Sequence, residues 1–288
     1  MTFDQETRES APYAGKDLGS RSFLITPDLV MRYVNSLALS DPSRAGILEA
    51  GSPVPVIVLQ EAEQLFAGNH FPNRYGELWV RQEWYFSEPI VLGDAVDVEA
   101  RVVDVYQRKA RTIVATEHVF KRDSRRIARS LHHNSFLVEQ SRGPLDLKPR
   151  QLAGIHRPES PLTGEVFVGP VRKFTRAQCQ AFYANTRNYH NDEGAAALLG
   201  FTNVVIGGGM ILPYVCELIE QRFGHDWASP GSLDVKFVNV LNPDEQFEVS
   251  GRVKEPSPSV RGRTYSIEVS CRLSTGTTIA VGSATTSA

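Results

Sequence analysis

The sequence predicts an α+β protein in which antiparallel strands cover a few helices, built from two halves with the same plan. Several segments alternate apolar and polar residues with a period of two, as strands with one buried face do. Other segments repeat apolar residues at helical spacing. These segments follow one another in the same order in both halves of the chain, which indicates an internal repeat.

Each half begins with a short predicted helix. Thr26 precedes the apolar pattern of residues 29–37, and Thr175 precedes that of residues 179–183. A threonine hydroxyl at this place can accept a hydrogen bond from a free N–H of the first helical turn. Both threonines are therefore predicted to be N-caps.

A longer apolar helix is expected next in each half. The first covers residues 54–66 and the second residues 210–223. Pro213 lies early in the second helix, where a missing N–H costs little. Gly68 and Gly224 follow the two segments, as glycine often follows a helix.

Three or four strands complete each half. Residues 78–86 match residues 233–238, and residues 95–105 match residues 247–253 in their alternation of apolar and polar side chains. Residues 265–273 alternate in the same way. A sheet with one apolar face needs helices to cover it, so the strands of each half are predicted to pack on its helices.

The joint between the halves is predicted at residues 144–169. This stretch holds several prolines and has little periodicity. The N-terminal half would then be residues 1–143 and the C-terminal half residues 170–288.

Composition and charge argue against several classes of function. The 288 residues are 41% hydrophobic and 22% charged, as in soluble globular proteins, and the net charge of −2 gives no sign of a nucleic-acid partner. No apolar run reaches the roughly eighteen residues of a membrane helix, and the polar N-terminus is unlike a signal peptide. The three cysteines have no metal spacing and predict reduced thiols in a cytoplasmic protein. Patterns for a metal or another cofactor are absent.

Residues 188–210 carry the candidate site. A turn containing His190 leads into a helix of small residues, and a Gly-Phe pair ends that helix ten residues after the histidine. A run of three glycines, residues 207–209, then opens the long apolar helix. This arrangement resembles the active-site stretch of MaoC-like proteins, the (R)-specific enoyl-CoA hydratase (hydratase 2) family of the hotdog superfamily.

The resemblance implies a double hotdog, in which each half is a long helix wrapped by a curved antiparallel sheet. It also implies a hydro-lyase that adds or removes water at the α,β double bond of an acyl thioester, carried on CoA or an acyl carrier protein. No nucleic acid and no membrane is expected as a partner, and a further pairing of two chains into a homodimer stays open. The first half lacks a matching site, and in such relatives the degenerate half makes room for the acyl tail. Aromatic residues available for that space, or for the core, are Phe66, Phe71, Trp79, Trp84 and Tyr85.

His190 takes the place of the family histidine, which acts on water together with an aspartate. An imidazole can relay a proton near pH 7, although a turn histidine can also serve structure alone. The family run Asp-x-Asn-Pro-hydrophobic-His is not kept. Asn185 stands where an ungapped count puts the aspartate, and with a loop about three residues shorter Asn188 takes the place of the family asparagine. Because an amide cannot accept a proton, Asn185 and Asn188 are expected to hold water or substrate.

Three interpretations of the missing aspartate stay open. His190 acts with the two amides alone, a carboxylate arrives from elsewhere, or hydration is lost and the protein only binds or scaffolds an acyl thioester. A hotdog thioesterase that uses Glu61 or Glu217, on the two long helices, is a further alternative. The candidate carboxylates for hydration are Asp192 and Glu193 beside the histidine, and Asp41 and Glu61 in the first half.

The glycine run departs from the family as well, because Gly208 stands where a His-Gly-Met run usually has its histidine. Free N–H groups at a helix N-terminus can still polarise a carbonyl, so those around Gly208 and Gly209 are predicted to stabilise the enolate oxygen. A tight turn with positive φ explains the glycines equally well. The remaining candidates for substrate binding are Arg187, Tyr189 and Met210.

Overall fold

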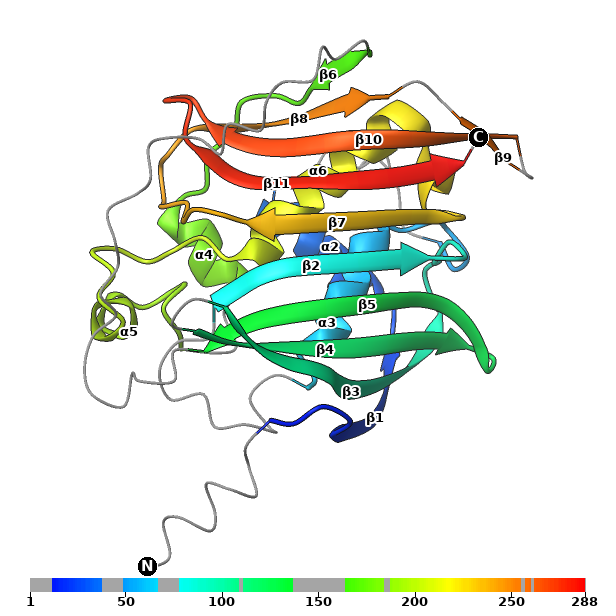
Figure 1. Cartoon of the computed structure of the whole chain (residues 1–288), viewed down its shortest axis with the longest axis horizontal. Helices are drawn as coiled ribbons and strands as arrows, with labels where there is room; N and C mark the ends of the chain where they lie inside the picture. Colours follow the sequence, from blue (N-terminus) through cyan, green and yellow to red (C-terminus); the bar gives the residue numbers. More distant parts are fainter. Residues whose placement is uncertain are drawn as a thin grey trace, which may run out of the picture.

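In the part of the chain that the structure describes, eleven strands form a single antiparallel sheet (Figure 1). The computed structural model describes residues 12–37, 49–66, 78–108, 111–136, 164–183, 187–254, 257–259 and 262–287. The first half contributes β1 (Asp17–Leu24), β2 (Leu78–Phe86), β3 (Ala95–Arg108), β4 (Arg111–Arg122) and β5 (Arg125–Phe136). The second half contributes β6 (Val166–Val168), β7 (Gly231–Phe237), β8 (Phe247–Val253), β9 (Ser257–Ser259), β10 (Gly262–Leu273) and β11 (Thr278–Ser287).

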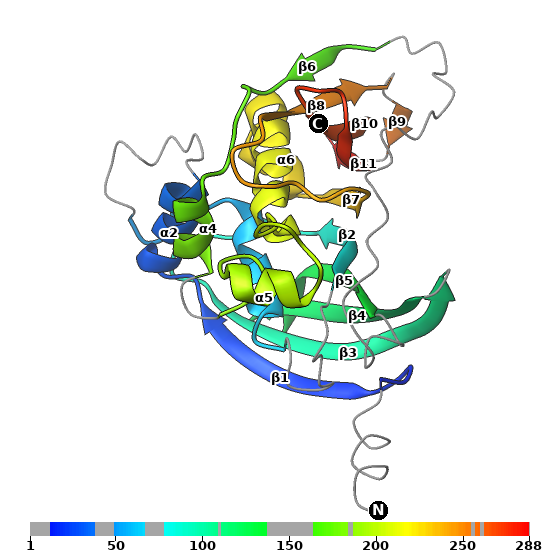
Figure 2. The same ribbon diagram turned by 90° about the vertical axis from the view of Figure 1, so that its left-hand side faces the viewer.

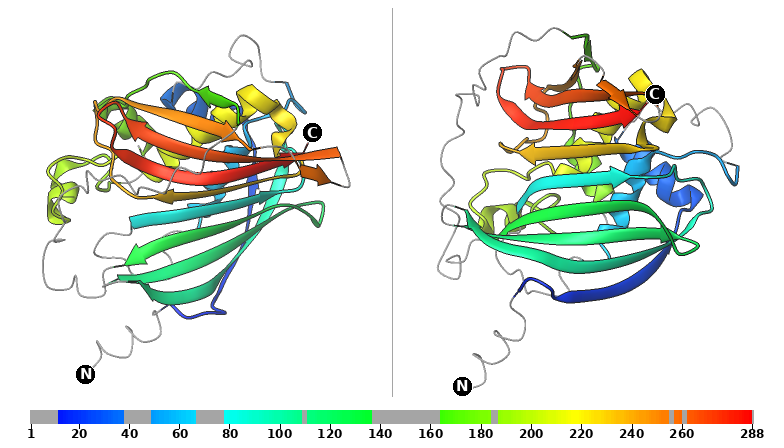
Figure 3. Two further views of the ribbon diagram at one scale, coloured as in Figure 1. Left: turned by 45° about the horizontal axis from the view of Figure 1, so that its top comes forward. Right: turned by 45° about the vertical axis from the view of Figure 1, so that its right-hand side comes forward.

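The order of the strands repeats outward from the centre of the sheet. β2 and β7 pair at the centre, from Arg81 opposite Lys236 to Phe86 opposite Gly231. From β2 the order continues β5, β4, β3, β1, and from β7 it continues β11, β10, β8, β6. The chain order of the strands is thus the same on both sides, which confirms the predicted repeat. The two halves meet along the β2–β7 seam (Figure 3).

The helices lie on the concave side of the curved sheet (Figure 2). The two predicted N-caps are confirmed: Leu29 N donates to Thr26 Oγ1 at 3.2 Å, and Thr175 forms a reciprocal capping box with Gln178. The α-helices are α2 (Pro27–Leu37), α3 (Gln60–Glu63), α4 (Arg176–Phe182), α5 (Glu193–Leu198) and α6 (Gly208–Phe223), with 3₁₀ turns η2 (Val56–Leu59) and η4 (His225–Ala228).

The prediction of a long helix over residues 54–66 was wrong, because only η2 and the four-residue α3 form there. Pro55 stands directly before η2, and the β-branched residues 56–58 that follow are poor helix formers. After α3 the N–H groups of residues 64–66 bond to carbonyls three positions back, so the turn stays tight. Within the described ranges, a long central helix is present in the second half and not in the first. Gly68 lies outside the described residues.

The core fills the space between the helices and the sheet. Every residue of α6 from Met210 to Ile219 is buried there. The three cysteines are buried and free of disulfides. Among the helices that the structure describes, none is long and apolar enough to span a bilayer.

The second half of the sheet begins ahead of residue 170. Within the predicted linker, residues 144–169, the described part starts at residue 164. It forms β6, whose three residues pair with β8. The part of that segment before residue 164 lies outside the description.

Candidate active site

His190 lies in a polar turn between α4 and α5 that fixes its own shape. The Asn188 side-chain oxygen accepts a hydrogen bond from His190 N at 2.9 Å. Asn191 in turn accepts from Asn188 N at 2.9 Å and donates to the Tyr183 carbonyl at 2.8 Å. The turn is therefore tied to the end of α4, and the amide oxygen of Asn188 is used in holding the backbone.

The His190 ring has a defined tautomer. Its Nδ1 lies 2.6 Å from the Val205 carbonyl oxygen, which can only accept, so Nδ1 carries a hydrogen. Nε2 then holds a lone pair, and no partner for it lies in the described parts of the chain. Burial lowers the His190 pKa to about 4, against a smaller opposing effect of the Val205 carbonyl. The ring is neutral near pH 7 and can act as a base through Nε2.

No described carboxylate replaces the family aspartate beside this ring. The His190 pKa is shifted by burial and by the Val205 carbonyl, and no acidic side chain contributes. Asp192 accepts from Ala195 N at 2.7 Å as the N-cap of α5 and pairs with Arg187 at 2.9 Å. Glu193 pairs with Arg176. Asn185 and Asp41 lie outside the described residues.

The three predicted substrate-binding residues have different surroundings. Arg187 is 77% exposed and is held by Asp192. Tyr189 stacks on Phe201, with ring centroids 5.8 Å apart, and packs in a small apolar cluster beside α5. Met210 is fully buried in the main core.

Two of the glycines at the start of α6, Gly207 and Gly208, are required by close packing. None of residues 207–209 has a positive φ, so the tight-turn explanation does not hold. A Cβ on Gly207 would overlap the Tyr183 hydroxyl, and one on Gly208 would lie 2.7 Å from the rings of Trp79 and Phe237. Gly207 is the N-cap and offers no side-chain hydrogen bond, so the first N–H groups of α6 have no side-chain cap.

The first half reaches this same helix start. Gln60 Nε2 in α3 donates to the Gly209 carbonyl oxygen at 2.8 Å. The Trp79 ring packs against Gly208 and stacks on His132 at 4.5 Å between centroids. His132 is paired with the buried Glu63 at 3.1 Å. Gln60 was not among the residues that the sequence singled out, because its polarity within an apolar segment is the only signal that it carries there.

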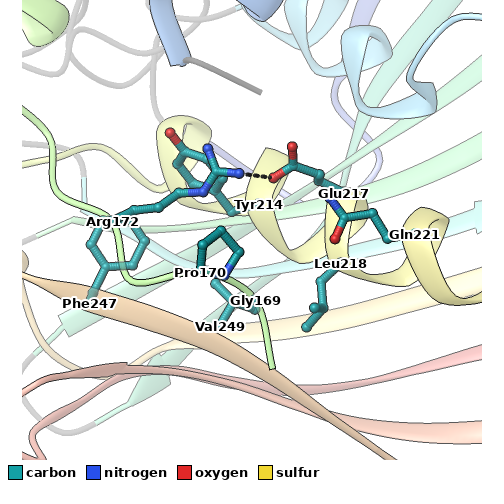
Figure 4. Close-up of a pocket in the computed structure, with 9 residues that line it drawn as sticks. All are labelled: Gly169, Pro170, Arg172, Tyr214, Glu217, Leu218, Gln221, Phe247 and Val249. Carbon is teal, nitrogen blue, oxygen red and sulfur yellow. Dashed lines mark hydrogen bonds and ion pairs between the residues drawn. The ribbon is translucent and has the colours of Figure 1, made fainter. Parts of the chain in front are cut away.

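The two glutamates considered for a thioesterase are both paired with arginines. Glu61 pairs with Arg32 at 2.6 Å and accepts from the Tyr33 hydroxyl at 3.2 Å. Glu217 pairs with Arg172 at 2.9 Å in a small pocket between α6, β8 and the segment after β6 (Figure 4). That pocket is a separate place, because Glu217 follows Gly208 by nine positions, roughly 14 Å along the helix axis.

Fold and site together define a double-layered α+β protein whose second half presents a neutral histidine beside the start of its central helix. No protein-family profile and no curated protein sequence matches the chain. Similar solved structures are found, and they define the fold as the double hotdog.

A structure described as a MaoC-like dehydratase aligns with a TM-score of 0.73 at 14% identity, covering 94% of this chain and 98% of the other. A Mycobacterium tuberculosis protein described as a double hotdog aligns with a TM-score of 0.62 at 8% identity, covering 96% and 98%. A 12:0-ACP thioesterase from Umbellularia californica aligns with a TM-score of 0.53 at 10% identity, covering 93% and 92%. The predicted double hotdog, with MaoC-like dehydratases among its structural neighbours, is therefore confirmed.

Proposed function

We propose that this protein is a hydro-lyase of the MaoC-like type, acting at the α,β double bond of an acyl thioester carried on CoA or an acyl carrier protein. One observation carries the proposal: the neutral His190 lies next to the start of α6, with its Cε1 3.2 Å from where a Cβ on Gly207 would be. A base and a helix N-terminus are the two groups that addition of water to an enoyl thioester needs.

In the hydration direction, His190 Nε2 takes a proton from water as the hydroxyl oxygen bonds to Cβ of the substrate. The electron pair of the double bond moves to Cα and the thioester carbonyl, so negative charge develops on the carbonyl oxygen. N–H groups at the start of α6 stabilise that charge. The imidazolium then returns its proton to Cα, which completes the addition of one water molecule.

The test is hydration of crotonyl-CoA and of a longer trans-2-enoyl-CoA, followed by the loss of enoyl absorbance. We expect turnover by the native protein and a loss of at least about a hundredfold in kcat for His190→Gln, which removes the base. His133→Asn is a matched control, because His133 is paired with Glu83 at 3.0 Å in the first-half sheet. Equal rates for the native protein and His190→Gln would overturn the proposal.

Two alternatives have observations in their favour. The lack of a described carboxylate beside His190 favours a protein that binds or scaffolds the acyl thioester without hydrating it. The likeness to a 12:0-ACP thioesterase favours thioester hydrolysis by Glu61 or Glu217. Acyl-CoA binding without turnover would support the binder, and release of free thiol in the same assay would support the thioesterase. The arginine partners of both glutamates argue against a nucleophilic role.

A further inference from the structure

The Tyr183 hydroxyl lies at the start of α6, between His190 and the glycine run. Tyr183 is the C-cap of α4, and its ring is nearly parallel to that of His190, at 17° with centroids 4.6 Å apart. Its oxygen is so close to the backbone of Gly207 that only a glycine fits there. The tyrosine was not among the candidates that the sequence provided.

The described part of the chain makes no use of the hydrogen-bonding capacity of this hydroxyl. Among the residues that the structure describes, no group forms a hydrogen bond with Tyr183 Oη, although the backbone N–H and carbonyl of the same residue are both bonded. Burial raises the Tyr183 pKa far above its usual value, and nearby negative charge, including that of Glu61, adds to the effect. The group therefore stays protonated and is available as a donor.

We propose that the Tyr183 hydroxyl donates a hydrogen bond to the thioester carbonyl oxygen of the substrate, alongside the first N–H groups of α6. Three features support this: among the described residues the hydroxyl has no hydrogen-bond acceptor, it touches the N-cap of α6, and it lies beside the His190 ring. The hydroxyl donates a hydrogen bond and transfers no proton, so the proton transfers of the proposed hydration are unchanged. This inference rests on the proposed function.

The crowding around Gly208 explains why the side-chain donor to the carbonyl comes from the end of α4. A side chain at Gly208 has no room, because Trp79 and Phe237 occupy the space that its Cβ would need. A donor for the carbonyl must then be a backbone N–H or a side chain from another element. Tyr183 is such a side chain, since its hydroxyl lies against Gly207, the N-cap of α6.

Tyr183→Phe is the decisive variant, because it keeps the stacked ring and removes only the oxygen. Removing one donor of this kind lowers kcat by about 10²–10³-fold in other enzymes, so we expect a loss of about a hundredfold in kcat with KM changed less than threefold. Tyr265→Phe is the matched control, since Tyr265 packs on Phe223 at the far end of α6. We expect it to retain the native kcat.

A binding readout separates this role from a structural one. The absorption band of 2,4-hexadienoyl-CoA moves to longer wavelength when its carbonyl is polarised by hydrogen bonds. We expect this shift with the native protein and with Tyr265→Phe, and a clearly smaller shift with Tyr183→Phe at saturating protein. An unchanged melting temperature of Tyr183→Phe would show that the fold is intact.

The outcomes distinguish the two proposals. A native-sized spectral shift in Tyr183→Phe overturns the role of Tyr183, whether or not the protein hydrates enoyl-CoA. A native protein that shifts the band without hydrating any enoyl-CoA overturns the hydro-lyase, and the reduced shift of Tyr183→Phe would still support the hydrogen bond. A native protein that neither binds nor shifts the probe overturns both.

Discussion

At the scale of single residues, the chemistry of the site depends on which polar atoms already have a hydrogen-bond or ion-pair partner. His190 uses Nδ1 on the Val205 carbonyl, and this contact leaves Nε2 as the free base. Asp192, which the sequence offered as a replacement carboxylate, is committed to the cap of α5 and to Arg187. A residue type indicates what a side chain can do, whereas its partners determine whether it is available.

The neighbouring glycines of α6 give a matched pair of variants. A Cβ on Gly208 would lie 2.7 Å from the rings of Trp79 and Phe237, whereas the nearest atom to a Cβ on Gly209 is at 3.6 Å. We expect Gly208→Ala to lower the free energy of unfolding by about 1–3 kcal/mol, as overpacking does, and Gly209→Ala to leave it unchanged or slightly raised. Urea unfolding measures both. Equal effects of the two variants would contradict the packing explanation.

The low pKa of His190 predicts the pH dependence of hydration. The ring loses its proton near pH 4 in the folded protein, so the base form predominates above about pH 5. We expect kcat/KM to be flat from pH 6 to 8 and to fall only as the pH approaches 4. A fall centred near pH 6.5, the usual histidine value, would show that the ring is solvated in the working enzyme.

A second histidine, His118 of β4, is buried, and together with His190 it predicts acid lability. Burial lowers the pKa of both His190 and His118 to about 4, below the value near 6.5 of an unfolded histidine. Between these values the unfolded state binds more protons, so the free energy of unfolding decreases as the pH falls from about 6.5 to 4. Urea midpoints across this range measure the slope. His190→Gln should make the slope shallower, and an unchanged slope would contradict the assignment.

At the scale of elements, the site depends on short helices whose ends are well capped. α4 has only seven residues, yet it carries Tyr183 at its C-terminal end. Its start is held by the reciprocal bonds of Thr175 and Gln178. α5 has Leu199 as its C-cap, and Gly200 follows with a φ of 81°, which suits glycine. Phe201 comes next and is buried.

Removal of the α4 cap is expected to destabilise the protein and to loosen Tyr183. Thr175→Ala leaves the Gln178 N–H without its acceptor, so we expect a loss of about 1 kcal/mol in the free energy of unfolding. Thr175→Ser keeps the hydroxyl and serves as the control. Thermal and urea unfolding of both variants measure the effect. An equal loss in Thr175→Ser would show that the methyl group, and not the cap, is responsible.

At the scale of the whole molecule, the seam between the halves is also part of the core. Arg81 in β2 donates two hydrogen bonds of 2.7 Å to Asp234 in β7. Trp84 stacks on Phe86, which packs edge-on against Trp227 of the second half. The halves share buried surface along the seam and at the start of α6, so neither has a complete core without the other.

This shared core predicts that the two halves unfold together. The three tryptophans of the chain, residues 79, 84 and 227, are packed at or near contacts between the halves, so their fluorescence reports on that interface. We expect the urea transition followed by tryptophan fluorescence to coincide with that followed by far-ultraviolet circular dichroism. A fluorescence transition at clearly lower urea would mean that the halves separate before either unfolds.

Local patterns in the sequence were enough for much of the fold. Alternation with period two located β2, β3, β7, β8 and β10, and Thr26 and Thr175 marked two helix starts, because these signals depend on neighbouring residues. The helix predicted over residues 54–66 was wrong for a related reason. Its apolar spacing suited a helix, but the prolines and β-branched residues at its start permit only a short turn.

The sequence by itself therefore determined the repeat, the antiparallel sheet and the place of His190, because each of these follows from short patterns of neighbouring residues. The tertiary structure alone decided the surroundings of that histidine. Gln60 bonds to Gly209 across 149 positions, and Trp79 fills the space beside Gly208. The overlap of Tyr183 with Gly207 is likewise a matter of packing. Contacts of this kind arise only when the folded core brings distant segments together, and no spacing along the chain records them.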